Sequence, residues 1–504
     1  MFDTILVSLG YVFTWQSLLF IFLGTSIGII IGAIPGLNVL MAIAICLPFT
    51  FGMNSICGML LLLGIFCGGT YGGSITAILI NTPGTPAAAA TTIEGYKLTQ
   101  KGRSGEALYM ALYASVFGGL MSTFALILFA PQLAKVALTF TPAEYFALGI
   151  FGLSIIILAS GKYVVKGIIM GCLGLLCSTI GLDPIEASTR FTFDQTSLMG
   201  GLQLVPFLIG LFAISEVINR SAHILQGKLN LERKDQTNLT LRQVWSKKYM
   251  KTLVKSGLIG TVIGAIPGTG SVIASFLSYN ESLRSSKHKE EYGQGSLEGV
   301  CACETANNGA TSSTLIPMLT LGIPGDAVSA VLMGALTVHN LVPGTKLFVD
   351  HGDIVYTLMI GLIIINILMG VLGHYACKGF IKVVDLPSHI LLPMIVVLCV
   401  IGSYAVGNKI VDVQTMMVMG VIGYFLIRAN FPLTPLLLGM VLGPIMEQAF
   451  RQQMIISKGN WLSFLYRPIS FTFIIVAILC ICLPLIQRFI AFYKKYRTGK
   501  SANN

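Results

Sequence analysis

Apolar stretches long enough to cross a lipid bilayer recur from one end of this chain to the other. Only 11% of the 504 residues are charged and the mean hydropathy is +0.81, whereas soluble domains carry about 25% charged residues. About 20 apolar residues are needed for a helix to cross the hydrocarbon layer. The sequence therefore predicts an all-α polytopic membrane protein. Predicted spans lie near 55–93, 107–129, 142–160, 164–181, 198–218, 300–338, 354–376, 388–407, 411–427, 432–449 and 467–489, with two further apolar segments near 20–50 and 256–279.

The net charge of +11 is concentrated in short polar segments between these spans. Such a distribution indicates membrane topology rather than a nucleic-acid partner, because basic loops stay on the cytoplasmic side. The 219–255 linker and the 491–504 tail are the most basic segments. We therefore expect a multi-pass membrane protein with a cytoplasmic C-terminus.

The apolar segment 256–279 has basic residues on both flanks, so a full crossing would conflict with the charge pattern. A re-entrant hairpin that turns at Ala265–Gly268 resolves this conflict, because Pro and Gly interrupt a helix there. A similar turn precedes it near the N-terminus. Ile27–Gly36 reads IGIIIGAIPG and Ile259–Gly268 reads IGTVIGAIPG, identical at eight of ten positions. This match predicts an internal duplication.

Each copy of the motif is followed by a second Pro-Gly break. In the first half we expect it around Gly72–Ser74 and 81–86, and in the second around Asn307–Ser313 and 321–326. A single Pro-Gly is usually a kink, but paired breaks in a duplicated chain favour the broken helices of secondary transporters. The charge pattern orients the halves oppositely, which predicts two inverted-topology repeats.

The predicted organisation is as follows. The first inverted repeat is 1–218, with a hairpin at 20–50 and a broken helix at 55–93. After the linker 219–255, the second repeat is 256–490, with a hairpin at 256–279 and a broken helix at 300–338, and the tail 491–504 follows.

We expect the breaks to bind substrate through half-helix N-termini and backbone N–H groups, because no Lys or Arg lies well inside a predicted span. Carbonyl groups at the same breaks could hold Na⁺; no other metal and no cofactor are expected. The candidate substrate-binding residues are Gly36, Asn38, Thr82, Pro83, Gly84, Thr85, Thr269, Gly270, Ser271, Asn307, Asn308, Gly322, Pro324 and Gly325. The candidate coupling-ion residues are Asn38, Asn81, Glu304 and Asp326.

Glu304 is the most informative acidic residue, because an ionisable group inside a span indicates function. The alternative is a carboxyl at the cytoplasmic mouth of the span, either solvated or paired with Arg284. Asp326 could be a cation ligand, a proton carrier or a helix cap. Glu94 and Glu144 are expected at the membrane interfaces.

Four segments resemble the large permease subunit of the tripartite tricarboxylate transporter family, and the likeness covers nearly the whole chain. They are GAIPGLN at Gly32–Asn38, GGTYGGSITAILINTPGTPAAAATTIEGY at Gly68–Tyr96, GAIPGTGS at Gly264–Ser271 and ETANNGATSSTLIPMLTLGIPGD at Glu304–Asp326.

This resemblance implies a three-component importer of small carboxylates, such as citrate-like tricarboxylates, driven by a Na⁺ or H⁺ gradient. The implied partners are a small four-helix membrane subunit and a periplasmic solute-binding protein, and association with further copies of this chain stays open. An elevator-like carrier follows by analogy. The absence of a GxxxxGK[ST] motif agrees with transport that is not driven by ATP.

The sequence bears on two other classes of function. A channel or uniporter for small anions could use the same broken helices; it predicts uptake that ignores ion gradients and needs no partner. An intramembrane enzyme would need a catalytic set, but the six histidines lie at loops or span ends without metal-ligand spacing. We therefore predict that the chain is not an enzyme.

Overall fold

The computed structural model describes residues 2–35, 37–183, 186–221, 239–376, 388–482 and 486. Gly36, residues 222–238 of the predicted linker and the predicted tail 491–504 lie outside these residues. The chain forms two compact units, Met1–Leu138 with Val205–Tyr424 and Thr139–Leu204 with Phe425–Asn504. Each unit combines segments from both halves of the sequence, so the units divide the chain differently from the sequence repeat.

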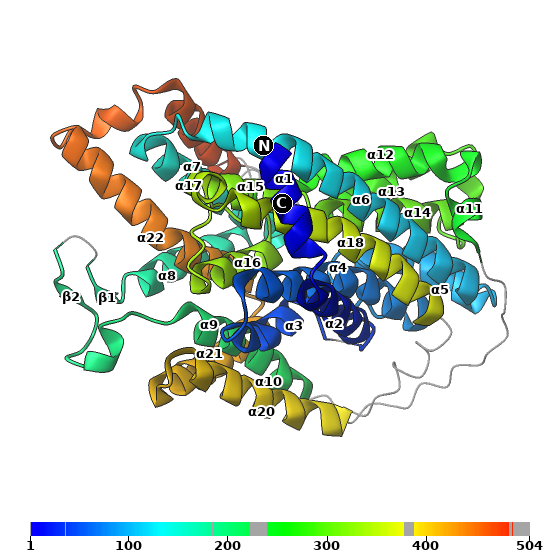
Figure 1. Cartoon of the computed structure of the whole chain (residues 1–504), viewed down its shortest axis with the longest axis horizontal. Coiled ribbons are helices and arrows are strands. Elements are labelled where there is room, and N and C mark those ends of the chain that lie inside the picture. Colours follow the sequence, from blue (N-terminus) through cyan, green and yellow to red (C-terminus); the bar gives the residue numbers. More distant parts are fainter. Residues whose placement is uncertain are drawn as a thin grey trace, which may run out of the picture. The chain divides into compact units, whose positions relative to one another are not determined.

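The larger unit is built almost entirely from helices (Figure 1). Its first half contains α1 (Phe2–Val12), α2 (Trp15–Gly32), α3 (Val39–Cys46), α4 (Ser55–Ile80), α5 (Ala89–Gln100), α6 (Ser104–Ala137), α9 (Leu204–Leu208) and α10 (Ser215–Ser221), with a π-helical turn, η4, at Ile209–Ile214. Its second half contains α11 (Leu241–Val244), α12 (Lys247–Gly264), α13 (Gly270–Ser285), α14 (Leu297–Thr311), α15 (Leu315–Leu321), α16 (Ala327–Val338), α17 (Thr345–Asp350), α18 (Gly352–Ala376), α20 (Ser388–Gly407) and α21 (Ile410–Arg428).

Helices α2 and α4 make the closest helix pair of the first half, because glycines recur at every fourth position on both. A Cβ at Gly28 would lie 2.6 Å from the carbonyl oxygen of Ile65, and one at Gly32 would lie 2.4 Å from that of Gly69. Small residues at this spacing let two backbones touch. Residues later in α2 contact residues later in α4, so the two helices run parallel. The intervening α3 must therefore return in the opposite direction.

Helices α12 and α14 repeat this arrangement in the second half. A Cβ at Gly260 would lie 2.5 Å from the carbonyl oxygen of Ala306, and one at Gly264 would lie 2.8 Å from the Cα of Ala310. Residues later in α12 again contact residues later in α14, so these helices also run parallel. The intervening α13 must therefore run in the opposite direction. α2 and α12 are both 18 residues long, and they begin and end 232 positions apart. The duplication seen in the sequence thus extends to the bounds and packing of the helices.

The two Pro-Gly breaks after these hairpins are present, but their exact positions differ from the prediction. Gly72–Ser74 lies inside the uninterrupted helix α4, and the chain breaks only at 81–88. These glycines instead admit the close approach of α2, since a Cβ at Gly72 would lie 2.6 Å from the carbonyl oxygen of Ile29. In the second half α14 continues through Asn307 and Asn308 to Thr311, a turn follows at 312–314, and the main break is at 322–326.

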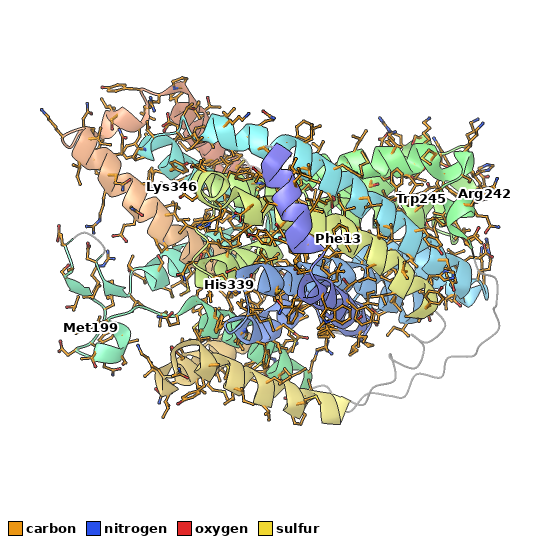
Figure 2. All side chains as sticks on the ribbon, viewed as in Figure 1. Phe13, Met199, Arg242, Trp245, His339 and Lys346 are labelled. Carbon is orange, nitrogen blue, oxygen red and sulfur yellow. The ribbon has the colours of Figure 1, made fainter. Side chains whose placement is uncertain are left out.

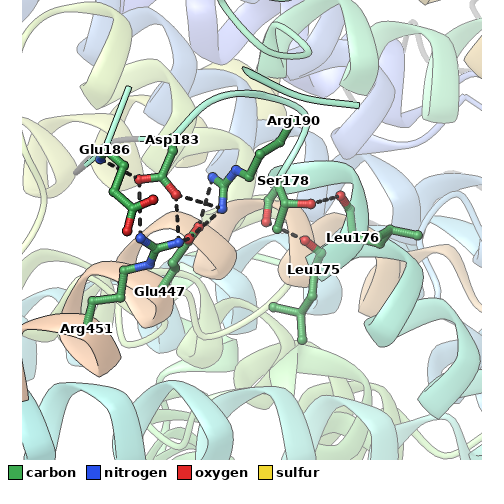
Figure 3. A network of polar contacts seen from close by, with 9 residues as sticks. Leu175, Leu176, Ser178, Asp183, Glu186, Arg190, Glu447 and Arg451 are labelled. Carbon is green, nitrogen blue, oxygen red and sulfur yellow. Dashed lines mark hydrogen bonds and ion pairs between the residues drawn. The ribbon is translucent and has the colours of Figure 1, made fainter. Parts of the chain in front are cut away.

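The smaller unit comprises α7 (Pro142–Ala159), α8 (Val164–Ser178), a two-stranded antiparallel ladder, α22 (Leu433–Ile456) and a helix at Pro468–Cys482. Strands β1 (Gly181–Leu182) and β2 (Thr189–Arg190) pair Gly181 with Arg190. Asp183 forms ion pairs with Arg190 and Arg451, with N–O distances of 3.5 and 2.6 Å. Glu447 also forms an ion pair with each of these arginines (Figure 3). This network attaches the ladder to α22.

Seven helices of the described residues are long and apolar enough to cross a membrane, and shorter apolar helices occupy most of the remaining predicted spans. The polytopic all-α prediction is therefore confirmed. The seven helices are Trp15–Gly32, Ser55–Ile80, Ser104–Ala137, Leu204–Ser221, Gly352–Ala376, Ile410–Arg428 and Leu433–Ile456.

Candidate functional site

The hairpin turn and the helix break of the second half meet directly. The backbone N–H of Gly268 donates to the carbonyl oxygen of Gly325 at 2.7 Å. α15 ends at Leu321 and is capped by Gly322, whose φ of 70° is left-handed, a conformation that favours glycine. The chain then turns back until a Cβ at Gly325 would lie 2.8 Å from the Cβ of Thr314. The break is thus a tight loop packed against the start of α15.

The first half builds its break in the same way. α4 ends at Asn81, also left-handed with φ 57°. The chain turns back, and the N–H of Gly84 donates to the carbonyl oxygen of Gly73 at 3.0 Å. A Cβ at Gly84 would lie 2.6 Å from the carbonyl oxygen of Gly32, the last residue of α2. In each half, therefore, the break contacts the end of the hairpin's first helix or the turn that follows it.

Polar side chains just after the Pro-Gly turns accept backbone N–H groups of the segments that follow. Asp326 Oδ1 accepts the N–H of Ser329 at 2.7 Å and caps α16. Thr85 Oγ1 accepts the N–H of Ala88 at 3.3 Å. Asn38 caps α3 by accepting the N–H of Met41 at 2.8 Å. Among the three roles considered for Asp326, the contact observed is that of a helix cap.

The predicted site residues fall into two environments. Those at the turns are only partly covered: Asn81, Thr82 and Pro83 are exposed, and Asn38, Thr269 and Ser271 are half-buried. A second group, Asn307, Asn308 and Glu304, is fully buried inside the unit on α14. Gly84, Gly270, Gly322, Pro324 and Gly325 are buried at the turns. Gly36 cannot be assigned to either group, since it lies outside the described residues.

Helices that follow the breaks pack across to the other half of the sequence. α5, after the first break, packs on α13 and α14, and α16, after the second, packs on α3 and α4. His339, labelled in Figure 2, follows the last residue of α16. Its Nε2 lies 3.2 Å from Thr50 Oγ1. Thr91 of α5 donates a hydrogen bond to Glu304 of α14. In the larger unit, the helix after each break therefore packs against helices of the other half of the sequence.

Glu304 is completely buried, which excludes the solvated alternative. Its carboxylate accepts hydrogen bonds from the hydroxyl groups of Thr91 and Ser115, the latter at 3.3 Å. Arg284 pairs with Glu281 instead, at 2.8 Å. No ion pair of Glu304 is found within the described residues. The charge-pair interpretation is thus wrong, because Arg284 lies on the exposed end of α13.

Glu94 has a role that the sequence analysis missed. The side chain is fully buried and its two oxygens accept four hydrogen bonds, from the Tyr279 hydroxyl at 2.6 Å and from the backbone N–H groups of Gly293, Gly295 and Ser296. Glu94 thereby holds the α13–α14 connection on α5. Its neighbours come from a segment 200 positions away, so nothing local in the sequence could identify them.

Arg220 is a second residue that the sequence analysis missed. Its guanidinium donates to the carbonyl oxygen of Pro35, in the first hairpin turn, at 2.6 Å and to Glu216 at 2.8 Å. The same Glu-x-x-x-Arg pattern recurs in α22 as Glu447 and Arg451, again as an ion pair. Comparison of these two segments of the sequence would have drawn attention to the pair.

A cavity of about 460 Å³ opens between the basic ends of α12 and α13. Lys247, Lys251, Lys255 and Lys287 line it together with Glu281 and Glu298. None of the predicted site residues is among its lining residues, and the cavity is separate from the Pro-Gly turns.

Comparison with known proteins identifies relatives along nearly the whole chain. The model of the tripartite tricarboxylate transporter TctA family matches residues 18–438. An uncharacterised 52.8 kDa protein of the TAR-I ttuC′ 3′ region of Agrobacterium vitis is 36% identical over 481 residues, 95% of each chain. An uncharacterised protein of the TAR-II ttuC′ 3′ region of the same organism is 37% identical over 227 residues, 45% of this chain and 94% of its own. No solved structure matches. The chain belongs to the tripartite tricarboxylate transporter TctA family.

Proposed function

We propose that this chain is the substrate-translocating subunit of a binding-protein-dependent secondary transporter that imports small carboxylates, citrate-like tricarboxylates or related acids, using a Na⁺ or H⁺ gradient. Its family membership supports a transport role within a system of several components. A periplasmic solute-binding protein would deliver the substrate, and a small four-helix membrane subunit would complete the assembly. The complex would reside in the bacterial inner membrane, with the C-terminus of this chain in the cytoplasm.

The single observation that carries this proposal is the contact between hairpin and break in both halves. The hydrogen bond from Gly268 to Gly325 places one non-helical turn against another, and Gly84 packs against Gly32, the last helical residue before the first hairpin turn. Irregular backbone at membrane depth is tolerated only where protein or a watery cavity surrounds it. Two such paired turns are the arrangement that secondary transporters use to bind ions and carboxylates.

The returning segments favour re-entrant hairpins with inverted topology. α3 and the 3-10 turn after it, η1 (Leu47–Thr50), together cover only 12 residues, about 18 Å at 1.5 Å per residue. A bilayer core is about 30 Å thick, so this segment is too short for a full crossing. Together with the charge pattern, it supports an inverted pair of hairpins and, by analogy, an elevator-like movement of the turns.

In this proposal the turn residues bind the substrate. Backbone N–H groups and hydroxyls at Thr82–Thr85 and Thr269–Ser271 would hold carboxylates, because half-helix N-termini carry partial positive charge. The half-buried or exposed state of Asn38, Thr82, Thr269 and Ser271 leaves them accessible to a ligand. On α14, Asn307 and Asn308 would contribute to substrate binding and Glu304 would serve the coupling ion.

The test is uptake of labelled citrate into proteoliposomes that contain this chain, its small partner and the binding protein. A Na⁺ or a pH gradient is imposed or collapsed in parallel vesicles. We expect uptake that follows one gradient and requires the binding protein. Uptake that is indifferent to both would support the channel instead. If neither citrate nor a panel of other small dicarboxylates and tricarboxylates enters under any gradient, the proposed function is wrong.

A further inference from the structure

The centre of the larger unit contains a carboxylate with no compensating positive charge among the described residues. Glu304 lies in the middle of α14 and is fully buried. It receives hydroxyl hydrogen bonds from Thr91 on α5 and from Ser115 on α6. Hydroxyl groups alone compensate an ionised carboxylate poorly, because transferring a charge out of water is costly unless it is paired. This position therefore requires either a proton on the carboxyl or a bound cation.

Several buried polar atoms around this carboxylate lack any hydrogen-bond partner in the described part of the chain. They are Ser74 Oγ, Asn307 Oδ1 and Nδ2, and Asn308 Oδ1. Ser74 and Asn307 lie close enough to the Glu304 carboxyl to interact with its charge, although neither reaches it with full hydrogen-bond geometry, and Asn308 joins the cluster by donating to Ser115 at 2.8 Å. All three side chains are fully buried. Unpartnered buried polar groups are rare in native proteins, and several around one carboxyl indicate a ligand.

We infer that this cluster is a binding site for a dehydrated Na⁺ ion, held by the Glu304 carboxylate together with the Ser74, Thr91 and Ser115 hydroxyl oxygens and the Asn307 amide oxygen. The inference rests on the proposed function, in which Na⁺ would be the coupling ion. Hard cations are bound by carboxylate, carbonyl and hydroxyl oxygens. Each hydroxyl has two lone pairs, so Thr91 and Ser115 can coordinate the ion while still donating to Glu304.

The charge of the cluster selects a monovalent ion. Glu304 contributes one carboxylate, and the nearby Glu94 has both oxygens engaged by four donors. A divalent ion would therefore remain half uncompensated. A proton on Glu304 would leave Ser74 and Asn307 without partners, and a water molecule would leave the charge unpaired. Na⁺ compensates the charge and coordinates the Ser74 and Asn307 oxygens at once, whereas Asn307 Nδ2, a donor, and Asn308 Oδ1 take no part in the site.

The site would connect the two halves of the sequence. Ser74, Thr91 and Ser115 come from α4, α5 and α6 of the first half, and Glu304 and Asn307 come from α14 of the second. α14 leads to Thr314, against which the Gly325 turn packs. Occupation of the cluster therefore stabilises the helix that supports the second break.

The experiment measures thermal unfolding of the full chain in lipid nanodiscs while NaCl replaces choline chloride at constant ionic strength, with KCl as a parallel series. We expect a saturable rise of the midpoint with Na⁺ that K⁺ does not reproduce at equal concentration. Glu304→Gln, which keeps the side-chain shape, should abolish the rise. Glu290→Gln, an exposed acid with 74% side-chain exposure, should retain it.

A second variant keeps the inference testable if Glu304→Gln does not fold. Ser74→Ala should weaken the apparent Na⁺ affinity at least about ten-fold, without lowering the midpoint in choline, because it removes an unpartnered hydroxyl. Ser285→Ala, at an exposed position of α13, is its control.

Two results would overturn the inference: an equal Na⁺ response in all variants, or a midpoint that follows pH but not Na⁺. Failure of carboxylate uptake with Na⁺ binding intact would contradict the proposed function alone.

Discussion

The N–H of Gly268 and the carbonyl oxygen of Gly325 form a 2.7 Å hydrogen bond between two turns that are 57 positions apart. Both residues follow a proline, and both belong to non-helical segments between helices. Because each turn satisfies a backbone group of the other, neither can move away without losing a hydrogen bond inside the protein. The hairpin α12–α13 and the start of α16 are therefore expected to move together.

The Pro-Gly turns should not tolerate even one added methyl group. A Cβ at Gly325 would lie 2.8 Å from Thr314 Cβ, and one at Gly84 would lie 2.6 Å from the Gly32 carbonyl oxygen. We expect Gly325→Ala or Gly84→Ala to lower uptake at least about ten-fold, because a misplacement of about 1 Å disrupts binding geometry. Membrane insertion, measured by membrane fractionation, should be unchanged. Gly52→Ala, which meets nothing within 4 Å, should transport normally, and normal uptake by both turn variants would contradict the assignment.

The glycine contacts between parallel helices should determine stability rather than transport specificity. Gly28→Ala places a methyl group 2.6 Å from the Ile65 carbonyl oxygen, and Gly260→Ala places one 2.5 Å from that of Ala306. Forced overpacking costs about 1–3 kcal/mol, so thermal unfolding in detergent should shift downward for both variants. Gly10→Ala has open space around it and should unfold like the unmodified chain. Unchanged midpoints for both would show that the helices can separate freely.

Replacement of Glu94 by Gln should loosen the α13–α14 connection. The carboxylate accepts four hydrogen bonds, whereas Gln offers one oxygen and points an amide N–H₂ group at backbone donors. Leaving buried donors unpaired costs about 1–3 kcal/mol. Hydrogen exchange at 293–296 should accelerate, and the unfolding midpoint should fall. Glu106→Gln, which removes only a pair with the half-exposed Arg103, provides the control; equal exchange in the two variants would refute the role of Glu94.

Arg220 should hold the first hairpin turn through Pro35. Arg220→Gln shortens the side chain and removes the charge-assisted bond of 2.6 Å. Since Arg220 is partly exposed, a loss of about 1 kcal/mol is expected, which would speed hydrogen exchange in the turn after α2 about five-fold. Arg242→Gln, an exposed arginine on α11 (Figure 2), should leave exchange there unchanged. No difference between the two variants would mean that Arg220 contributes nothing to the turn.

Local sequence was sufficient for the helices and for the location of the turns. The repeated IGAIPG at Ile31–Gly36 and Ile263–Gly268 predicted two interruptions, and both halves turn there, because Pro and Gly act on the backbone within a few residues. The break expected at Gly72–Ser74 was wrong for a complementary reason. Glycines that break an isolated helix can instead serve close packing, and the partner helix α2 is not visible in local sequence.

The sequence by itself determined a polytopic helical protein with a duplicated pair of Pro-Gly turns, since apolar length and turn chemistry are local properties of the chain. Only the tertiary structure decided what surrounds each polar side chain. Glu304 lies among Thr91 and Ser115, and Glu94 lies under the α13–α14 connection, through contacts that span about 200 positions. Hydrogen bonding and burial depend on distances in space, and the order of residues along the chain does not encode these distances directly.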